Sequence, residues 1–426
     1  MSSQQLQDKK KSALNVLIIG EYFPPDIGGA ATRASNVAKG LTLNGCNVTI
    51  VTAFPHYPTG KIPKEYQYKP LNVEYIGKSR VIRTFVLPLE SKGLLKRLLV
   101  FWSFIVSSLF ALPFVGKIDV VWAANPDVFV LVPAIAYGGI KGKPVVSNVD
   151  DLIIEDLYDL DLVKRGSAIS RLAEFVARAL FAKVKAATPI SPGYISTIAR
   201  YGVDRRRIQV VRGGVDLDVF KPRPKQKFGD KFVVLYSGGF SIAYDFEQIF
   251  KVAKILERLD PDVEFIIQGK GELLSSMRSR VNELKLKNVQ IIDKLLSRED
   301  VSEFLSQADV LILPLANFRT PYRGMSSKLY EYQAVGKPII SCSTGLPSIY
   351  VKETNSGLVV QPGDSEALAK AVLDLKENPS LACAMGEKGR KKVENEASIG
   401  AVGLMMKRIF ESILGKPSLS SYVASD

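Results

Sequence analysis

The chain has 426 residues, 46% of them hydrophobic and 23% charged, which exceeds the usual size of one compact core and excludes a disordered protein. We therefore expect two domains. Residues 1–225 hold 31 basic and 18 acidic side chains, a net charge of +13, and residues 226–426 hold 26 and 25, a net of +1, so we expect an anionic partner to meet the N-terminal half.

The first half of the chain alternates short β-branched runs with longer helical patterns, which is typical of a parallel sheet with crossover helices. Strands are predicted at 16–19, 48–52, 81–85, 120–123 and 145–148. Helices are predicted at 31–44, 94–112 and 167–185.

The run 98–115 (LLVFWSFIVSSLFALPFV) has 18 residues without a charge and follows Lys92, Lys96 and Arg97. Its length is at the lower limit for a membrane span, and three serines and Pro113 weaken that interpretation further. A buried helix of an α/β domain and a helix lying on a bilayer surface fit the run equally well, and both fit better than a span.

The pattern of strands and helices begins again after 221–231 (KPRPKQKFGDK), which is typical of an interdomain linker. Strands are predicted at 232–237, 263–268, 289–292, 310–313 and 338–341, and helices at 246–259, 273–284, 301–308, 327–335 and 365–376. We expect residues 1–222 and 223–398 to form two doubly wound Rossmann-like domains that face one another across a cleft. A helix at about 399–416 is expected to pack back on the first.

The three cysteines, Cys46, Cys342 and Cys383, are odd in number and far apart in the sequence. This spacing favours reduced thiols in a cytosol over disulfides or a metal site.

Glycine-containing loops follow several of the predicted strands. Gly28 and Gly29 precede a helix after the first strand, where backbone N–H groups can approach an anion. A tight loop with permissive backbone angles is the competing interpretation. His56, the only histidine, lies in a loop after the second strand, and we interpret it as structural or as lining an acceptor site.

The second half carries Gly239 after one strand and Gly269-Lys270-Gly271 after the next. Lys328 and Glu331 then lie one turn apart on a predicted helix that begins after Arg323-Gly-Met-Ser-Ser. The carboxylate could accept two sugar hydroxyls and the ammonium could neutralise a diphosphate. A surface Lys–Glu pair is the alternative.

Taken together, these residues resemble the retaining glycosyltransferases of family four, which have the two-domain GT-B fold. The resemblance runs from about residue 14 to about residue 400. Within the family, the sequence is similar to the subgroup that assembles surface polysaccharides and glycoprotein glycans. It rests on seven segments in the same order: EYFPPDIGGAATRASNVAKGLTLNGCNVTIVTAFPHYP, VVRGGVDLDVF, FVVLYSGGF, VEFIIQGKGELL, ADVLILPL, SSKLYEYQAVGKPII and NSGLVVQPGDSEALAKAV.

The resemblance implies a hexosyl transfer from a nucleoside diphosphate sugar to a glycan acceptor, with retention and without a metal, a cofactor or a protein nucleophile. Glu331 would hold the ribose hydroxyls and Lys328 the diphosphate. The residues implied to line the donor site with them are Gly28, Gly29, Gly239, Gly269, Lys270, Met325 and Ser326.

Three departures from the family pattern are informative. Arg323 stands where the family has a glutamate, which makes it a candidate catalytic or donor-sugar residue. Asp150-Asp151 stands where many members have His-Asp, so Asp150 is a candidate base and Asp151 an acceptor-side residue, or both are solvated acids. The basic residues that often follow Gly238-Gly239 are absent, which leaves Lys328 and Lys270 as the diphosphate cations.

The basic N-terminal half, the 94–115 run and the helix at 165–185 together predict peripheral contact with anionic lipid at the cytoplasmic face of a membrane, where the acceptor would be lipid-linked. A sugar-nucleotide epimerase of the same fold and a non-catalytic sugar-nucleotide sensor are the alternatives. A nucleic-acid partner is not expected, because the motifs for one are missing.

Overall fold

The computed structural model describes residues 13–57, 59–89, 94–124, 128–159, 163–225, 229–317 and 324–415. The chain divides into two compact units: unit 1 comprises Met1–Arg212 and Ile399–Asp426, and unit 2 comprises Gly213–Ser398. The boundary lies earlier than the expected residue 222. The reason is that Val215 and Phe220, each 1% exposed, already pack in the core of unit 2.

Unit 1 contains a seven-stranded sheet in which one edge strand runs against the others. Only the pair β3 and β4 is antiparallel, and the remaining neighbours are parallel. In sheet order the strands are β3 (Leu71–Ile76), β4 (Ser79–Thr84), β2 (Asn47–Ala53), β1 (Asn15–Ile19), β5 (Val120–Ala123), β6 (Val145–Val149) and β7 (Ala186–Pro189).

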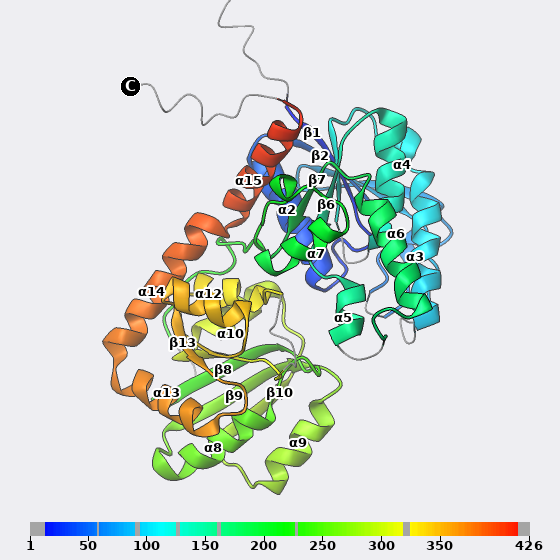
Figure 1. Cartoon of the computed structure of the whole chain (residues 1–426). Coiled ribbons are helices and arrows are strands. Elements are labelled where there is room, and N and C mark those ends of the chain that lie inside the picture. The colour runs from blue at the N-terminus through cyan, green and yellow to red at the C-terminus, as the bar shows by residue number, and fades with distance from the viewer. Residues whose placement is uncertain are drawn as a thin grey trace, which may run out of the picture. The chain divides into compact units, whose positions relative to one another are not determined.

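The two faces of this sheet are covered by different helices (Figure 1). One core joins alternate strand residues such as Leu17 and Ile19 to α3 (Leu94–Leu109), α4 (Leu131–Lys141) and α6 (Ala168–Phe181). The other core joins Val16 and Ile18 to α2 (Gly29–Leu43) and α15 (Ile399–Ile413). Two short helices, α5 (Ile153–Asp159) and α7 (Ile195–Arg200), complete the unit.

Helix α3 has one buried side and one exposed side. Phe101 and Phe104 lie in the core, whereas Trp102 and Val106 are 45% and 55% exposed. Of the helices in the described ranges, none combines the length and the apolar character needed to cross a bilayer.

Unit 2 contains a six-stranded sheet in which all neighbouring strands are parallel. In sheet order the strands are β10 (Val289–Asp293), β9 (Val263–Lys270), β8 (Phe232–Gly239), β11 (Val310–Pro314), β12 (Ile339–Cys342) and β13 (Gly357–Val360). The helices are α8 (Glu247–Leu259), α9 (Leu274–Glu283), α10 (Arg298–Ser306), α11 (Ser327–Ala334), α12 (Leu346–Thr354), α13 (Ser365–Glu377) and α14 (Pro379–Glu396).

The sheet of unit 2 is also buried on both faces. Val234 and Tyr236 of β8 pack with α8 and α13, whereas Val233 and Leu235 of the same strand pack with α11 and α14. Short 3-10 turns in the chain lie at Lys64–Tyr66, Leu112–Phe114, Val128–Val130, Pro192–Tyr194 and Arg205–Arg207. The expected fold class of two doubly wound parallel sheets is confirmed.

The contact of α15 with α2 depends on two glycines. A Cβ atom on Gly403 would lie 2.0 Å from the backbone carbon of Gly40, and a Cβ atom on Gly40 would lie 2.4 Å from the carbonyl oxygen of Ile399. Side chains at these positions would therefore separate the two helices.

We expect Gly403→Leu to lower the free energy of unfolding by about 1–3 kcal/mol, because overpacking a tight helix contact forces the backbones apart. Gly400→Ala is the matched control, since no atom lies within 4 Å of its added Cβ. Denaturant unfolding measures both. Equal stability of Gly403→Leu and the wild type would contradict the close contact.

Candidate functional site

The glycine loop of unit 1 ends at an uncapped helix N-terminus. Gly28 has a φ of +149°, and α2 begins at Gly29 without a side-chain cap and without an acidic residue in its first turn. A Cβ atom on Gly29 would have no atom within 4 Å. The first N–H groups of α2 therefore have room for an anion, and the role of Gly28 and Gly29 at the donor stays a prediction.

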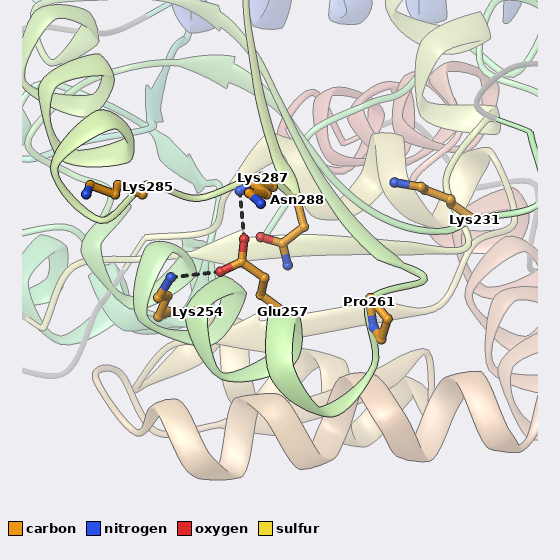
Figure 2. A pocket seen from close by; sticks show the side chains of 7 residues that line it. All are labelled: Lys231, Lys254, Glu257, Pro261, Lys285, Lys287 and Asn288. Atoms are coloured by element: carbon orange, nitrogen blue, oxygen red, sulfur yellow. Dashed lines mark hydrogen bonds and ion pairs between the residues drawn. The ribbon is translucent and has the colours of Figure 1, made fainter.

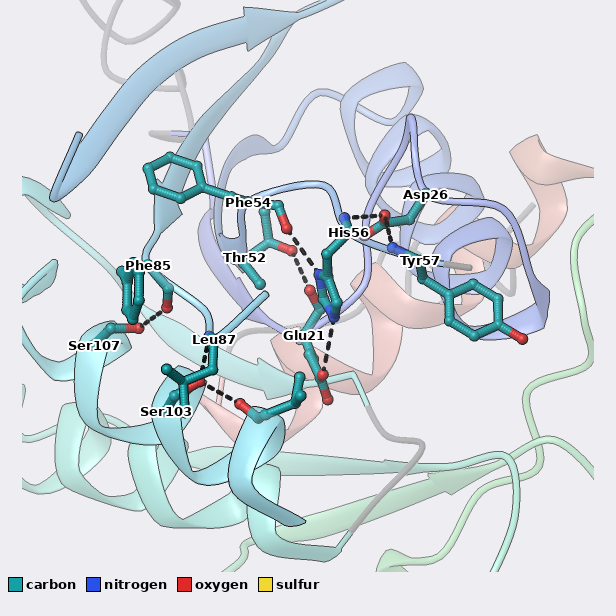
Figure 3. Close-up of polar contacts among 12 residues, drawn as sticks. Glu21, Asp26, Thr52, Phe54, His56, Tyr57, Phe85, Leu87, Ser103 and Ser107 are labelled. Carbon is teal, nitrogen blue, oxygen red and sulfur yellow. Dashed lines mark hydrogen bonds and ion pairs between the residues drawn. The ribbon is translucent and has the colours of Figure 1, made fainter. Parts of the chain in front are cut away.

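His56 lies in a buried polar cluster that ties two loops together (Figure 3). Its ring Nδ1 is 2.8 Å from the carbonyl oxygen of Phe54, and its Nε2 is 3.4 Å from Oε1 of Glu21. Asp26 accepts hydrogen bonds from the backbone N–H groups of His56 and Tyr57, at 2.8 and 2.9 Å. The His56 side chain is 1% exposed, so it holds the loop in place and does not reach solvent.

Burial and the neighbouring groups together set the pKa values of His56 and Asp26. Burial opposes protonation of His56, but the neighbouring Glu21 carboxylate outweighs it and raises the pKa of the imidazole above 6.5. Burial raises the pKa of Asp26, even though two backbone N–H groups favour its ionised form. In this buried cluster, both the His56 imidazole and the Asp26 carboxyl group therefore bind a proton more tightly than they would in water.

Asp150 follows β6 and lies beside a buried arginine. Its Oδ1 is 3.6 Å from Nε of Arg33, and its side chain is 15% exposed. Among the described residues, neither carboxylate oxygen has a hydrogen-bond partner, and the Nδ2 of Asn148 also lacks one. Burial raises the pKa of Asp150 to about 6, an effect that Arg33 and Asn148 oppose.

Asp151 differs from its neighbour because it is exposed, and its Oδ1 is 3.5 Å from the hydroxyl of Tyr194. The interpretation of both residues as solvated acids is therefore wrong for Asp150. The Asp151 side chain is exposed, but partial desolvation still raises its pKa, an effect that the Tyr194 hydroxyl opposes. Buried donors and acceptors that lack partners, as at Asp150 and Asn148, are the groups that a substrate hydroxyl could satisfy.

Arg33 anchors this region to the end of unit 1. Its guanidinium donates to the carbonyl oxygens of Val211, at 2.7 Å, and of Arg212, and also to Oδ1 of Asn148 at 3.3 Å. Arg212 is the last residue before the chain passes into unit 2. The buried Arg33 thus contacts both Asp150, the candidate base, and the residues at which the chain passes from unit 1 to unit 2.

In unit 2, β8 and β9 approach closely at their carboxyl ends. Gly238 pairs with Gly269, and their φ angles are +154° and +153°. A Cβ atom on Gly269 would lie 1.7 Å from the carbonyl oxygen of Gly238. Both glycines are required by geometry, whereas Gly239 has only a distant contact at 3.9 Å to the carbonyl oxygen of Lys270.

Lys328 of α11 reaches these glycines. A Cβ atom on Gly238 would lie 2.1 Å from its Nζ, which also lies 5.6 Å from the ring centre of Tyr236 and 5.7 Å from that of Tyr244. The aromatic faces attract the ammonium and hold it at the strand ends. The placement of Lys328 at the glycine loop agrees with the role that the family resemblance implies.

Glu331 is paired with a residue that the sequence did not suggest. Its Oε1 is 3.3 Å from Nη2 of Arg298, whose guanidinium stacks 4.9 Å from the ring centre of Phe220. Among the ion pairs of the described residues, none joins Lys328 to Glu331. The interpretation of the two as a surface pair is therefore wrong.

The remaining predicted residues of unit 2 lie around the start of α11 and the end of β9. Met325 is 8% exposed and packs in the core, and Ser326 is the N-terminal cap of α11 without a side-chain cap bond. Lys270 is 59% exposed, with its Nζ 3.9 Å from Oδ1 of Asp293. Arg323 lies outside the described residues.

A second basic feature of unit 2 lies away from this site. A pocket of about 500 Å³ at the amino ends of β8, β9 and β10 is lined by Lys231, Lys254, Lys285 and Lys287 (Figure 2). Glu257 accepts hydrogen bonds from Lys254 and from the backbone of Lys287. Because ligands of such sheets bind at the carboxyl ends of the strands, this pocket is not the candidate site.

Four residues that contact the predicted site residues were not predicted from the sequence: Arg33, Asn148, Glu21 and Arg298. Arg33 and Asn148 lie inside regular elements, where a helix arginine and a strand asparagine carry no motif. Arg298 lies 33 residues before Glu331 in the chain, and only the fold brings them together. One signal was available in the sequence: Asn148 lies in a predicted strand, and a buried asparagine is uncommon.

Two family models match successive parts of the chain. The model "Glycosyltransferase Family 4" matches residues 27–219, and the model "Glycosyl transferases group 1" matches residues 219–392. A putative colanic acid biosynthesis glycosyl transferase of Escherichia coli is 24% identical over 381 residues, which cover 84% of this chain and 91% of that protein. The chain spans about half the length of two other bacterial polysaccharide-biosynthesis glycosyltransferases that it matches.

Solved structures share the fold at low sequence identity. Sucrose-phosphate synthase from Thermosynechococcus elongatus is 18% identical with a TM-score of 0.73, over 94% of this chain and 99% of that one. HepE of Anabaena, solved with UDP-glucose, is 14% identical with a TM-score of 0.65, over 94% of this chain and 100% of that one. The expected GT-B fold is confirmed.

We expect the raised pKa of Asp150 to make the free energy of unfolding depend on pH. Its pKa is raised from 3.8 to about 6, so the folded state binds the proton more tightly than the unfolded state. The resulting stabilisation is complete below pH 3.8 and is lost as the pH rises through about 6. Relative to Asp150→Asn, the wild type should lose about 3 kcal/mol at most between about pH 4 and pH 7.

Denaturant unfolding at a series of pH values measures this loss. Glu65→Gln, a change of an exposed acid of the same unit, is the control and should follow the wild type. Parallel pH curves for the wild type and Asp150→Asn would mean that Asp150 ionises as an ordinary aspartate.

Proposed function

Because the chain belongs to the glycosyltransferases of family 4, whose models together match residues 27–392, we propose that it transfers a hexosyl group from a nucleoside diphosphate sugar to a hydroxyl of a lipid-linked glycan, with retention of configuration. The observation that carries the proposal is the Lys328 ammonium held at the glycine ends of β8 and β9. The UDP-glucose complex of HepE is consistent with this donor class.

The diphosphate is the group that the glycine ends would receive. Gly238 and Gly269 keep the strand ends free of side chains, so that backbone and phosphate can approach. Lys328 supplies a positive charge where negative charge develops on the leaving diphosphate. With that charge supplied by a side chain, we propose that transfer requires no metal ion.

Glu331 would accept hydrogen bonds from the ribose hydroxyls. Its carboxylate is 19% exposed and is held by Arg298, so it is oriented and still accessible. The role of Arg323 toward the donor sugar stays a prediction, as do the roles of Met325 and Ser326.

Asp150 would orient the acceptor hydroxyl and take up its proton. A carboxyl group with a pKa of about 6 exchanges protons near neutral pH, as a general base should. The hydroxyl would satisfy a carboxylate oxygen that otherwise lacks a partner. Asp151 and the His56 loop would lie on the acceptor side.

Peripheral docking on anionic lipid is the second part of the proposal. On α6, Ile169, Leu172 and Phe175 are 73%, 65% and 68% exposed, and Arg171 and Arg178 are exposed on the same helix. An apolar stripe flanked by cations favours the boundary between lipid head groups and acyl chains. The protein would then act at the cytoplasmic face of a membrane.

Donor binding is tested by calorimetry of the folded protein with UDP, GDP and ADP and their common sugars, without added metal. We expect one diphosphate to bind selectively, and Glu331→Ala to weaken it by about 1–3 kcal/mol, the cost of a lost hydrogen bond to a charged group. Glu366→Ala, an exposed change on α13, should have no effect. Unchanged donor affinity in Glu331→Ala would remove the proposed ribose contact.

Turnover separates transfer from the alternatives. Release of the nucleoside diphosphate only when a glycan acceptor is present supports a transferase. Release or isomerisation of the sugar without an acceptor would indicate an epimerase, and binding without turnover on any acceptor would indicate a sensor.

Lipid docking is tested by sedimentation with vesicles that contain anionic lipid. A variant that combines Arg171→Ala, Arg178→Ala and Lys183→Ala should bind the vesicles more weakly, by about 1 kcal/mol of binding free energy for each charge near the surface. Its binding should also depend less on the salt concentration. The control removes three exposed lysines of unit 2, Lys231, Lys285 and Lys287. Equal losses in the two variants would mean that net charge, and not α6, decides the binding.

A further inference from the structure

We propose that a groove on unit 1, between α3 and the segment that follows β4, binds the single apolar chain of the lipid-linked acceptor. The inference rests on the proposed function for the identity of its ligand. The groove itself is lined by Pro70, by two serines and by six large apolar side chains: Phe85, Leu87, Leu99, Trp102, Val106 and Phe110.

The groove has the size and the lining of a ligand site. Its volume is about 750 Å³, within the range of roughly 300–1,000 Å³ that small-molecule sites occupy. Trp102 is 45% exposed, Val106 55% and Phe110 72%. A continuous exposed apolar surface of this kind marks a site of interaction.

The hydroxyl groups in the groove are already used within the protein (Figure 3). Ser103 accepts a hydrogen bond from the backbone N–H of Leu87 at 2.8 Å and donates to the carbonyl oxygen of Val100. Ser107 donates to the carbonyl oxygen of Phe85. The groove therefore offers a ligand few polar partners, which favours a hydrocarbon chain over a sugar or a peptide.

The same contacts give the groove a direction. Leu87 meets Ser103 and Phe85 meets Ser107, so α3 begins at the carboxyl edge of the sheet and runs back along it. Lys96 is exposed at the start of α3, and Phe110 follows its end. A chain with an anionic head group would thus place the head near Lys96 and the tail toward Phe110.

The Phe110 end of the groove lies at the end of β4, beside the end of β2 from which the loop that carries His56 continues. The backbone N–H of Phe54 donates to the carbonyl oxygen of Thr84 at 2.9 Å, and Thr84 is the last residue of β4. Ser107 lies 3.1 Å from the hydroxyl of Thr84. Toward Lys96 the groove therefore extends past the carboxyl ends of the strands, so a chain with its head near Lys96 would leave its glycan on the side of the sheet where Asp150 and the His56 loop follow their strands.

The experiment uses the fluorescence of the full chain. The protein has two tryptophans, and Trp122 is fully buried, so Trp102 is the accessible reporter. A brominated single-chain alkyl phosphate, kept below its micelle concentration, should quench it saturably, whereas inorganic phosphate should not. Trp102→Phe should abolish the quenching.

Two variants identify the groove. Val106→Asp should weaken the alkyl phosphate at least tenfold. It should also lower turnover on an acceptor with a long chain, but not on one with a short chain. Phe114→Ser, a change of a residue that is 49% exposed and outside the groove, should leave both unchanged. Unchanged thermal unfolding and donor affinity in Val106→Asp show that it is folded.

Two other occupants of the groove would each give an outcome that overturns the proposal. Quenching by brominated vesicles alone, with none by the monomeric chain, would mean that the surface only docks on a bilayer. Loss of a dimer in light scattering of Val106→Asp, without quenching of the wild type, would mean that a second copy covers it. Chain binding without binding of any nucleotide would leave the groove in place and remove the proposed function instead.

Discussion

Strand β1 places Leu17 and Ile19 in one core of unit 1 and Val16 and Ile18 in the other, and β8 does the same with its neighbouring residues in unit 2. A parallel strand that is buried on both faces can present polar groups only where it ends. The candidate site follows this constraint, because Asp150, the His56 loop, Gly238 and Gly269 all follow or end a strand. The buried interiors of the strands stabilise the two units, and the candidate functional residues lie at the carboxyl ends of the strands.

The alternation of strands and helices was predictable because the buried strands are short apolar runs. The strands at 120–123 and 263–268 were recognised almost to the residue. The edge strands β3, β7 and β13 were missed. The residues of β3 and β13 are mostly only partly buried, and β7 is a run of four residues, Ala186–Pro189, that includes only one β-branched residue. Helix α14 was missed because its many charged residues mask a narrow buried stripe that includes Gly386, Gly389 and Val393.

The candidate site was predictable in its motifs but not in its partners. Lys328 and the glycines share a short sequence signature with the family, so the resemblance carried them. Arg33 and Arg298 act through contacts that link distant parts of the chain, and no local pattern marks such contacts. The different environments of Asp150 and Asp151 were also out of reach, because burial of one of two adjacent acids is decided by the fold.

Helix α15 completes a core whose other members are synthesised first. Val402, Met406, Ile409 and Phe410 pack among residues of β1, β2 and α2. During translation, the apolar side of α2 therefore stays uncovered until α15 leaves the ribosome, although domains usually fold from the N-terminus onward. Synthesis of unit 1 thus starts before that of unit 2 and is completed after it, and a ribosome that stops before residue 399 releases a chain with an open core.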